Sequence, residues 1–146
     1  HVIRLAIIPH DGMVSPSVAA RQGAAFNLPM NVASTDIHEG SLPPSKSFVE
    51  VLTPNVMLAA VKKAEDFPTD RDARSGGTDA LIVRVYELEG KDTEAKIRIT
   101  DLVKPGSPAK EVDLIEQPLA KSSAKMTGDV LSVKVTAYGI ASVMVG

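Results

Sequence analysis

Apolar and polar residues alternate with a period of two along the second half of the chain, as they do in β-strands that bury one face. The clearest run covers residues 93–102, where Ala95, Ile97 and Ile99 fall on one side and mostly charged residues fall on the other. Residues 130–136 repeat the alternation. Both runs therefore predict strands with one buried face and one wet face.

Further short segments predict strands because they are apolar or β-branched and are bounded by turn-forming residues. These segments are residues 2–8, 24–32, 48–52, 81–88, 111–115 and 138–145. In residues 24–32 the large apolar side chains share one parity, but Pro29 confines such a strand to a sheet edge or a bulge. Residues 18–22 predict a loop or a short helix, and residues 117–128 predict a polar connection.

Residues 55–66 carry conflicting signals. Asn55 is a good N-cap, and the following Val-Met-Leu-Ala-Ala-Val-Lys-Lys-Ala-Glu-Asp consists mainly of good helix formers. Local propensity alone therefore predicts a helix. Residues 67–77 are charged, contain glycine and lack periodicity, which predicts a surface loop.

The number and spacing of these segments indicate the fold class. Eight or nine short strands, with turns about every 8 to 15 residues, are typical of an all-β antiparallel sandwich. With 146 residues, of which 44% are apolar, the chain can bury one sizeable core but not two ordinary ones. We therefore expect a single β-sandwich domain over residues 1–146. Because the sequence starts with His1 rather than methionine, we expect it to be part of a longer polypeptide.

Composition excludes several classes of partner. The formal net charge of -2 offers no basic field for nucleic acid, and the apolar runs fall far short of the roughly 20 residues that cross a bilayer. We therefore expect a soluble protein with neither nucleic-acid nor membrane partners. The absence of cysteine leaves the compartment open, with the cytoplasm slightly favoured. Aromatic residues make up only 3%, which weighs against a dedicated carbohydrate-binding module.

Candidate catalytic and metal-binding residues are scarce. His1, His10 and His38 lack a second histidine or a carboxylate at a zinc-binding spacing. His10 lies in a Pro-His-Asp-Gly turn, where a structural role is favoured over a role as ligand or general base. The sequence also lacks a nucleophile elbow, a phosphate-binding glycine loop and a catalytic cysteine. We therefore predict no catalytic residue, no metal site and no cofactor in this chain.

Paired carboxylates can hydrolyse glycosides if they lie at a suitable distance and have different pKa values. The pairs in this sequence are Glu65 with Asp66, Asp70 with Asp72, and Glu87 with Glu89. Each pair lies in or beside a charged turn. Solvated strand ends or loops therefore explain them better than an active site does.

Arg84 and Tyr86 interrupt an otherwise apolar strand and point to the same face, because they are two residues apart. They form either a buried hydrogen-bonded pair or a polar edge that faces a neighbouring domain. We take both residues as candidates for an inter-domain surface.

Five segments, taken together, resemble a known family. They are residues 6–12 (Ala-Ile-Ile-Pro-His-Asp-Gly), 26–29 (Phe-Asn-Leu-Pro), 47–49 (Ser-Phe-Val), 55–66, and 81–87 (Leu-Ile-Val-Arg-Val-Tyr-Glu). In this order they resemble the C-terminal β-domain of glycoside hydrolase family 38, the α-mannosidases. The last two segments carry most of the specificity.

The resemblance implies that residues 55–66 form a strand despite their helix propensity. This strand would pair with residues 81–88 across a hairpin whose tip is residues 67–77. In such enzymes the zinc ion, the nucleophile and the acid/base residue belong to an N-terminal catalytic domain, which is similar to nothing in this sequence. The expected partner is that catalytic domain in the same polypeptide, and any glycan contact would come through the parent enzyme.

Two functions of different classes stay open. The first is a non-catalytic C-terminal domain that supports the hydrolysis of α-mannosides by an α-mannosidase-like enzyme. The alternative is an independent carbohydrate-binding β-sandwich module. A free-standing hydrolase would need a catalytic constellation that the sequence lacks. The first function predicts that this chain, taken alone, exposes an apolar patch where its partner lies.

Overall fold

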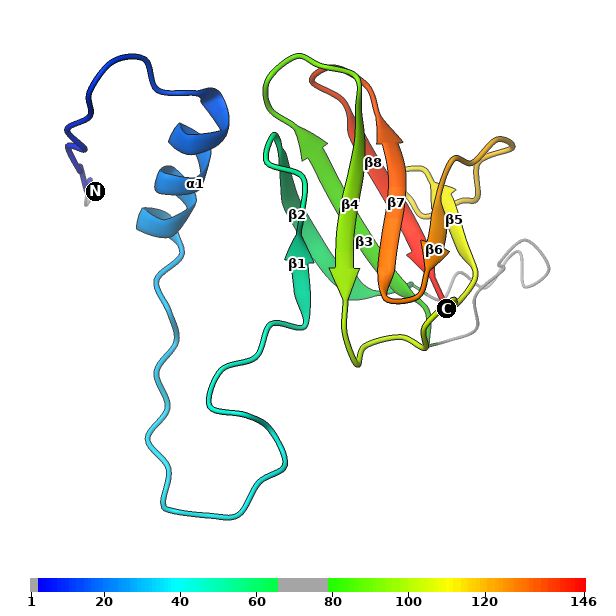
Figure 1. Cartoon of the computed structure of the whole chain (residues 1–146), viewed down its shortest axis with the longest axis horizontal. Coiled ribbons are helices and arrows are strands. Elements are labelled where there is room, and N and C mark those ends of the chain that lie inside the picture. The colour runs from blue at the N-terminus through cyan, green and yellow to red at the C-terminus, as the bar shows by residue number, and fades with distance from the viewer. Residues whose placement is uncertain (1–2, 66–78) are drawn as a thin grey trace.

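The computed structural model describes residues 3–65 and 79–146, and within these ranges the chain forms one helix and eight strands. The elements are α1 (Pro16–Asn27), β1 (Val49–Val51), β2 (Val56–Lys63), β3 (Leu81–Glu87), β4 (Thr93–Ile99), β5 (Ala109–Val112), β6 (Lys125–Thr127), β7 (Val130–Val135) and β8 (Ile140–Val145). Two antiparallel sheets, in the orders β1-β4-β7-β6 and β2-β3-β8-β5, stack face to face (Figure 1). The predicted all-β sandwich is confirmed.

The hydrophobic core lies between the two sheets, where alternating side chains from both meet. In β4 the three predicted inward residues, Ala95, Ile97 and Ile99, are fully buried, and the residues between them are exposed. Because successive side chains of a strand point to opposite faces, each strand supplies every second residue to this layer. The buried core residues are Val56, Val83, Val85, Ala95, Ile97, Ile99, Leu131, Val133, Val135, Ala141, Val143 and Val145.

Strand β2 confirms the pairing implied by the family resemblance. The segment consists of good helix formers, yet it pairs antiparallel with β3 in a register that puts Val56 opposite Glu87. A register shift between Leu58 and Ala60 marks a β-bulge. Pairing and burial outweigh local helix propensity here, because propensity differences amount to only a few tenths of a kcal/mol per residue. The predicted hairpin tip, residues 67–77, lies outside the described residues.

The two strands predicted nearest the N-terminus are wrong. Residues 3–8 have no regular structure, and residues 24–32 divide between the end of α1 and an irregular segment. Ser15 explains the helix, because its side chain accepts a hydrogen bond from the Val18 N–H and caps the first turn. The described structure provides no partner strand for these segments, so their alternating pattern does not lead to a β-strand.

The helix α1 also decides the open question about residues 18–22, which predicted either a loop or a short helix. Pro16 occupies the first helical turn, where its missing N–H costs nothing, and an alanine-rich segment follows. The helix therefore continues past residue 22 to Asn27.

Two smaller differences lie near the C-terminus. Strand β5 begins two residues before the predicted segment 111–115, and the connection predicted over residues 117–128 contains β6. Strand β6 pairs with β7 through a two-residue turn that starts at Gly128, whose φ of 59° is readily adopted by glycine. All eight strands lie between residues 49 and 145, and the expectation of a single domain over residues 1–146 stays a prediction.

Replacing Ile97 with alanine is expected to lower the free energy of unfolding by about 2 to 5 kcal/mol, because it leaves a cavity at a fully buried position. The matched control is Lys96→Ala on the exposed face of the same strand, with an expected change within about 0.5 kcal/mol. Urea denaturation of the three proteins measures both values. Equal losses at the two positions would contradict the assigned faces of β4.

Candidate functional site

In the described part of the chain, His10 and His38 each make only a local contact with a neighbouring backbone carbonyl. Within residues 3–65 and 79–146, no group of three or more His, Cys, Asp or Glu side chains is placed to hold a metal ion. The exposed ring of His10 contacts the Gly12 carbonyl through Nδ1 at 3.0 Å, inside the predicted turn. His38 makes a similar local contact with the carbonyl of Glu39, and His1 lies outside the described residues.

The carboxylate pairs have different surroundings. Glu65 is exposed and forms an ion pair with Lys62, as expected of a solvated strand end. Its partner Asp66 and the pair at residues 70 and 72 lie outside the described residues. Glu87 corrects the sequence interpretation, because this residue is only 2% exposed.

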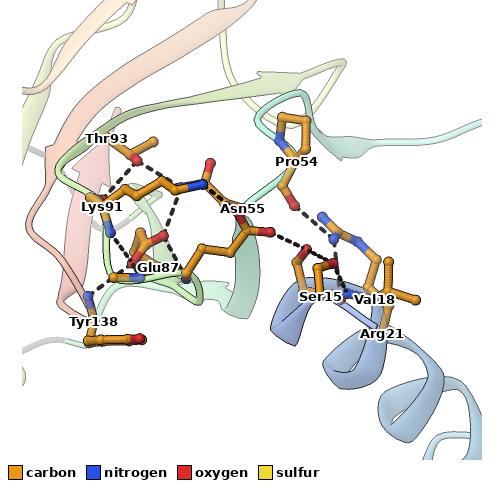
Figure 2. A network of polar contacts seen from close by, with 12 residues as sticks. Ser15, Val18, Arg21, Pro54, Asn55, Glu87, Lys91, Thr93 and Tyr138 are labelled. Carbon is orange, nitrogen blue, oxygen red and sulfur yellow. Dashed lines mark hydrogen bonds and ion pairs between the residues drawn. The ribbon is translucent and has the colours of Figure 1, made fainter. Parts of the chain in front are cut away.

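The buried carboxylate of Glu87 is the centre of a polar network at one end of the sandwich (Figure 2). Its five donors are the backbone N–H groups of Glu89 (2.7 Å), Gly90 (2.7 Å), Lys91 (3.2 Å) and Tyr138 (3.0 Å) and the side-chain amide of Asn55 (2.7 Å). Burial by itself raises the pKa of Glu87, but these hydrogen bonds outweigh it and lower the pKa from 4.5 to about 2. A general acid for glycoside hydrolysis needs a raised pKa, so Glu87 has the properties of a structural anion.

The Glu87 network joins three connections of the sandwich. It links the β3–β4 turn, the β7–β8 turn and the residue that precedes β2. Gly90 and Tyr138 both adopt positive φ, of 71° and 55°. A Cβ at Gly90 would lie 2.7 Å from the ring of Tyr138, so a larger residue would displace this ring and would also be strained by the positive φ.

Helix α1 is attached to this end of the sandwich by polar contacts (Figure 2). The hydroxyl of Ser17 donates to the Glu89 carboxylate at 2.7 Å, and this bond, with that from Lys91, lowers the pKa of Glu89. Arg21 donates to the carbonyls of Pro54 at 2.8 Å and Val56 at 3.1 Å. Because Val56 opens the edge strand β2, Arg21 also occupies a carbonyl at that sheet edge.

Arg84 and Tyr86 lie on the face of β3 opposite to the core, as their spacing predicts, and both are half-buried. Arg84 donates through Nε to the Ser142 hydroxyl at 2.8 Å and through Nη2 to the Leu114 carbonyl at 3.2 Å. The Tyr86 hydroxyl contacts the sulfur of Met57 at 3.1 Å. Each residue therefore has partners of its own, and the inter-domain role stays a prediction.

An apolar row crosses this outer face of the second sheet. Met57 on β2 and Ile140 on β8 flank Tyr86 in register on either side. Ile140 is 61% exposed, and Leu114 and Ile115, in the segment after β5, are similarly exposed. We call these five residues the outer-face patch. Sequence analysis missed the patch because only the strand register brings its members together.

The segment after β5 is fixed on the same face by an ion pair between the buried Glu116 and the partly exposed Lys62. Glu116, which is 3% exposed, accepts from the Lys62 ammonium at 2.6 Å and from the Glu65 N–H at 2.7 Å. Burial alone raises the pKa of Glu116, but these contacts and the nearby charge of Arg84 outweigh it and lower the pKa. Together with the Arg84 contact, this ion pair holds Leu114 and Ile115 in place.

The fold and these contacts define a two-sheet antiparallel module whose buried charges serve structural roles. Residues 55–143 match the family described as the glycosyl hydrolases family 38 C-terminal beta sandwich domain. The match covers more than half of the chain, so the chain belongs to this family. The resemblance inferred from the sequence is therefore confirmed. No curated protein matches the chain, and no helix in the described part is long and apolar enough to cross a membrane.

Replacing Glu87 with glutamine is expected to destabilise the sandwich, because the amide turns a donor toward N–H groups that need an acceptor. Folding lowers the pKa of Glu87 from 4.5 to about 2, so its charged form stabilises the fold above about pH 4.5. This contribution disappears as the pH falls from about 4.5 through about 2. Thermal unfolding at several pH values should show the Tm difference between the two proteins narrowing over that range.

The control for this experiment is Glu94→Gln, which removes an exposed carboxylate on β4. This change should leave Tm nearly constant at neutral pH. A Tm difference between Glu87→Gln and the unmodified protein that stays the same at every pH would contradict the assigned role of the Glu87 charge.

Replacing Arg21 with glutamine is expected to release α1 from the sandwich without changing the intrinsic helix propensity of the segment, because the two residues have similar propensities. A released helix of 12 residues is only marginally stable, so loss of two hydrogen bonds from a charged group should speed amide exchange in residues 16–27 at least about tenfold. Hydrogen exchange measured by mass spectrometry checks this. Arg98→Gln, on the exposed face of β4, is the matched control and should leave α1 unchanged. Equal effects of the two variants would show that Arg21 does not attach the helix.

Proposed function

We propose that this chain is the C-terminal accessory domain of an α-mannosidase-like glycoside hydrolase. It supports the hydrolysis of α-mannosides by a catalytic domain in the same polypeptide. The family match over residues 55–143 carries this proposal. The buried carboxylates agree with a supporting role, because Glu87 and Glu116 both have lowered pKa values and neither is suited to donate a proton.

The outer-face patch supports packing against a neighbouring domain. Exposed apolar residues that gather on one face of a module are typical of interaction surfaces. Here the strands hold the exposed Ile140 in register with the half-buried Tyr86 and Met57. Arg84 and Glu116 fix the segment that carries the exposed Leu114 and Ile115. Such a rigid apolar surface loses little conformational entropy when it becomes buried. In this proposal Arg84 and Tyr86 belong to the inter-domain surface.

Zinc belongs to the catalytic domain in this proposal. Within the part of the chain that the structure describes, no three ligand side chains converge, so these residues do not fit a zinc site. In this proposal the accessory domain contributes by packing against its partner. It buries apolar surface of its partner and holds the partner in its active shape.

Replacing Ile140 with aspartate in the intact enzyme is expected to lower its Tm and its mannosidase activity, because it buries an uncompensated charge at the inter-domain surface. Thr127→Asp is the matched control, since it adds the same charge at an exposed position on β6, in the other sheet. The control should keep nearly full activity. Turnover of an aryl mannoside and thermal unfolding of both variants provide the measurements.

Two outcomes would contradict the proposal. One is a folded, fully active mannosidase after deletion of residues 49–146, because a supporting domain cannot be dispensable. The other is heat of binding when this chain alone is titrated with mannosides, which would favour the carbohydrate-binding alternative.

A further inference from the structure

The segment between α1 and β1 exposes apolar side chains in a regular pattern. Leu28, Met30 and Val32 share one parity, and their exposed fractions are 75%, 91% and 92%. Figure 1 shows the segment after α1 running as extended, irregular chain beside the sandwich. We call residues 28–32 the arm segment. Residues 3–7 repeat the pattern with Ile3, Leu5 and Ile7, which are similarly exposed.

The backbone of the arm segment lacks hydrogen-bond partners among the described backbone groups, except at Leu28. The Leu28 N–H donates to the Ala24 carbonyl and so ends the helix. Beyond it, no described backbone group pairs with residues 29–32. The segment also carries no charge from Leu28 to Thr35. Uncharged, alternating apolar segments with unpaired backbone groups add readily to other strands, and native proteins usually pair or cover them.

The start of the arm segment is fixed in space. Ser17 and Arg21 attach α1 to the Glu89 carboxylate and to the carbonyls of Pro54 and Val56. The arm segment therefore begins about two helical turns after Arg21, the last of these attachment points. Attachment of this kind lowers the entropic cost of docking, because the segment has fewer positions to lose.

We propose that the arm segment binds as an added β-strand to an open sheet edge in the neighbouring part of the same enzyme. Main-chain hydrogen bonds supply the affinity in this binding mode, and alternate side chains fill apolar pockets. Leu28, Met30 and Val32 would enter the partner's apolar layer, and Asn31 would face away from it. Pro29 lacks an N–H group, so it fits an added strand at a position whose N–H would point away from the partner. This inference rests on the proposed function, which supplies the neighbouring domain.

The test compares hydrogen exchange of residues 30–34 in the intact enzyme and in this chain alone. Because Pro29 faces away from the partner, strand addition predicts that the amides of residues 30, 32 and 34, which face the partner, exchange at least about 100-fold more slowly in the intact enzyme. Met30→Asp in the intact enzyme should abolish that protection, because it places a charge in the apolar layer. Asn31→Asp, the matched control, adds the same charge on the opposite parity and should keep the protection within about threefold. The amides of β3 report whether the sandwich stays folded in every variant.

The outcomes separate this inference from the proposed function. Unprotected amides at residues 30, 32 and 34 in an enzyme whose activity depends on residues 49–146 would overturn the strand addition alone. Protection of these amides in an enzyme that remains active without residues 49–146 would support the strand addition and overturn the supporting role. Equal loss of protection in Met30→Asp and Asn31→Asp would overturn the assigned parity. Protection that appears in this chain alone and rises with its concentration would assign the segment to a second copy and overturn the proposal.

Discussion

The antiparallel pairing of β2 with β3 is the contact on which most of the remaining structure depends. It forces a segment of good helix formers into an extended strand and places Val56 in the core between the sheets. It also aligns Met57 with Tyr86 on the outer face and brings Asn55 within hydrogen-bonding distance of Glu87. The core, the outer-face patch and the polar network therefore share one register. A slip of one residue would turn every side chain of β2 to the opposite face.

The Glu87 carboxylate completes this arrangement at one end of the sandwich. Loops that enter and leave strands leave backbone N–H groups without partners, and such groups are costly when buried. One ionised carboxylate satisfies four of them, from two different turns, together with the side chain of Asn55. The next carboxylate along the chain, Glu89, binds Ser17 and so connects the helix to the same end. Local acidic residues thus connect segments that are far apart in sequence.

The chain combines a buried core with two kinds of exposed apolar surface. One is the outer-face patch on the rigid second sheet, and the other is the extended arm segment that follows α1. The sandwich core excludes water without either of them, so neither surface is needed to complete the fold. Apolar surfaces of this kind lower the free energy of a complex only when a partner covers them. This division agrees with the accessory role that we propose for the chain.

The sequence by itself determined the fold class and the faces of the regular strands. In β4 and β7 the alternation is strict, so the buried side could be predicted residue by residue. The shared face of Arg84 and Tyr86 followed from their spacing in the same way. Propensity alone failed at residues 55–66, where family resemblance supplied the long-range pairing that a local pattern does not contain. Alternation also failed at residues 24–32, where a capped, alanine-rich helix forms and the described structure provides no partner strand.

The tertiary structure alone decided the register and everything that depends on it. The partners of Arg84 and Tyr86, the outer-face patch and the burial of Glu87 all require strands or turns that lie far apart in sequence. The sequence predicts a solvated Glu87 because a charged turn follows it, whereas the donors to Glu87 come from three separate connections. Side-chain periodicity is a local property of one strand and can be read from the chain. The contacts between strands depend on how the sheets assemble, and no single segment encodes them.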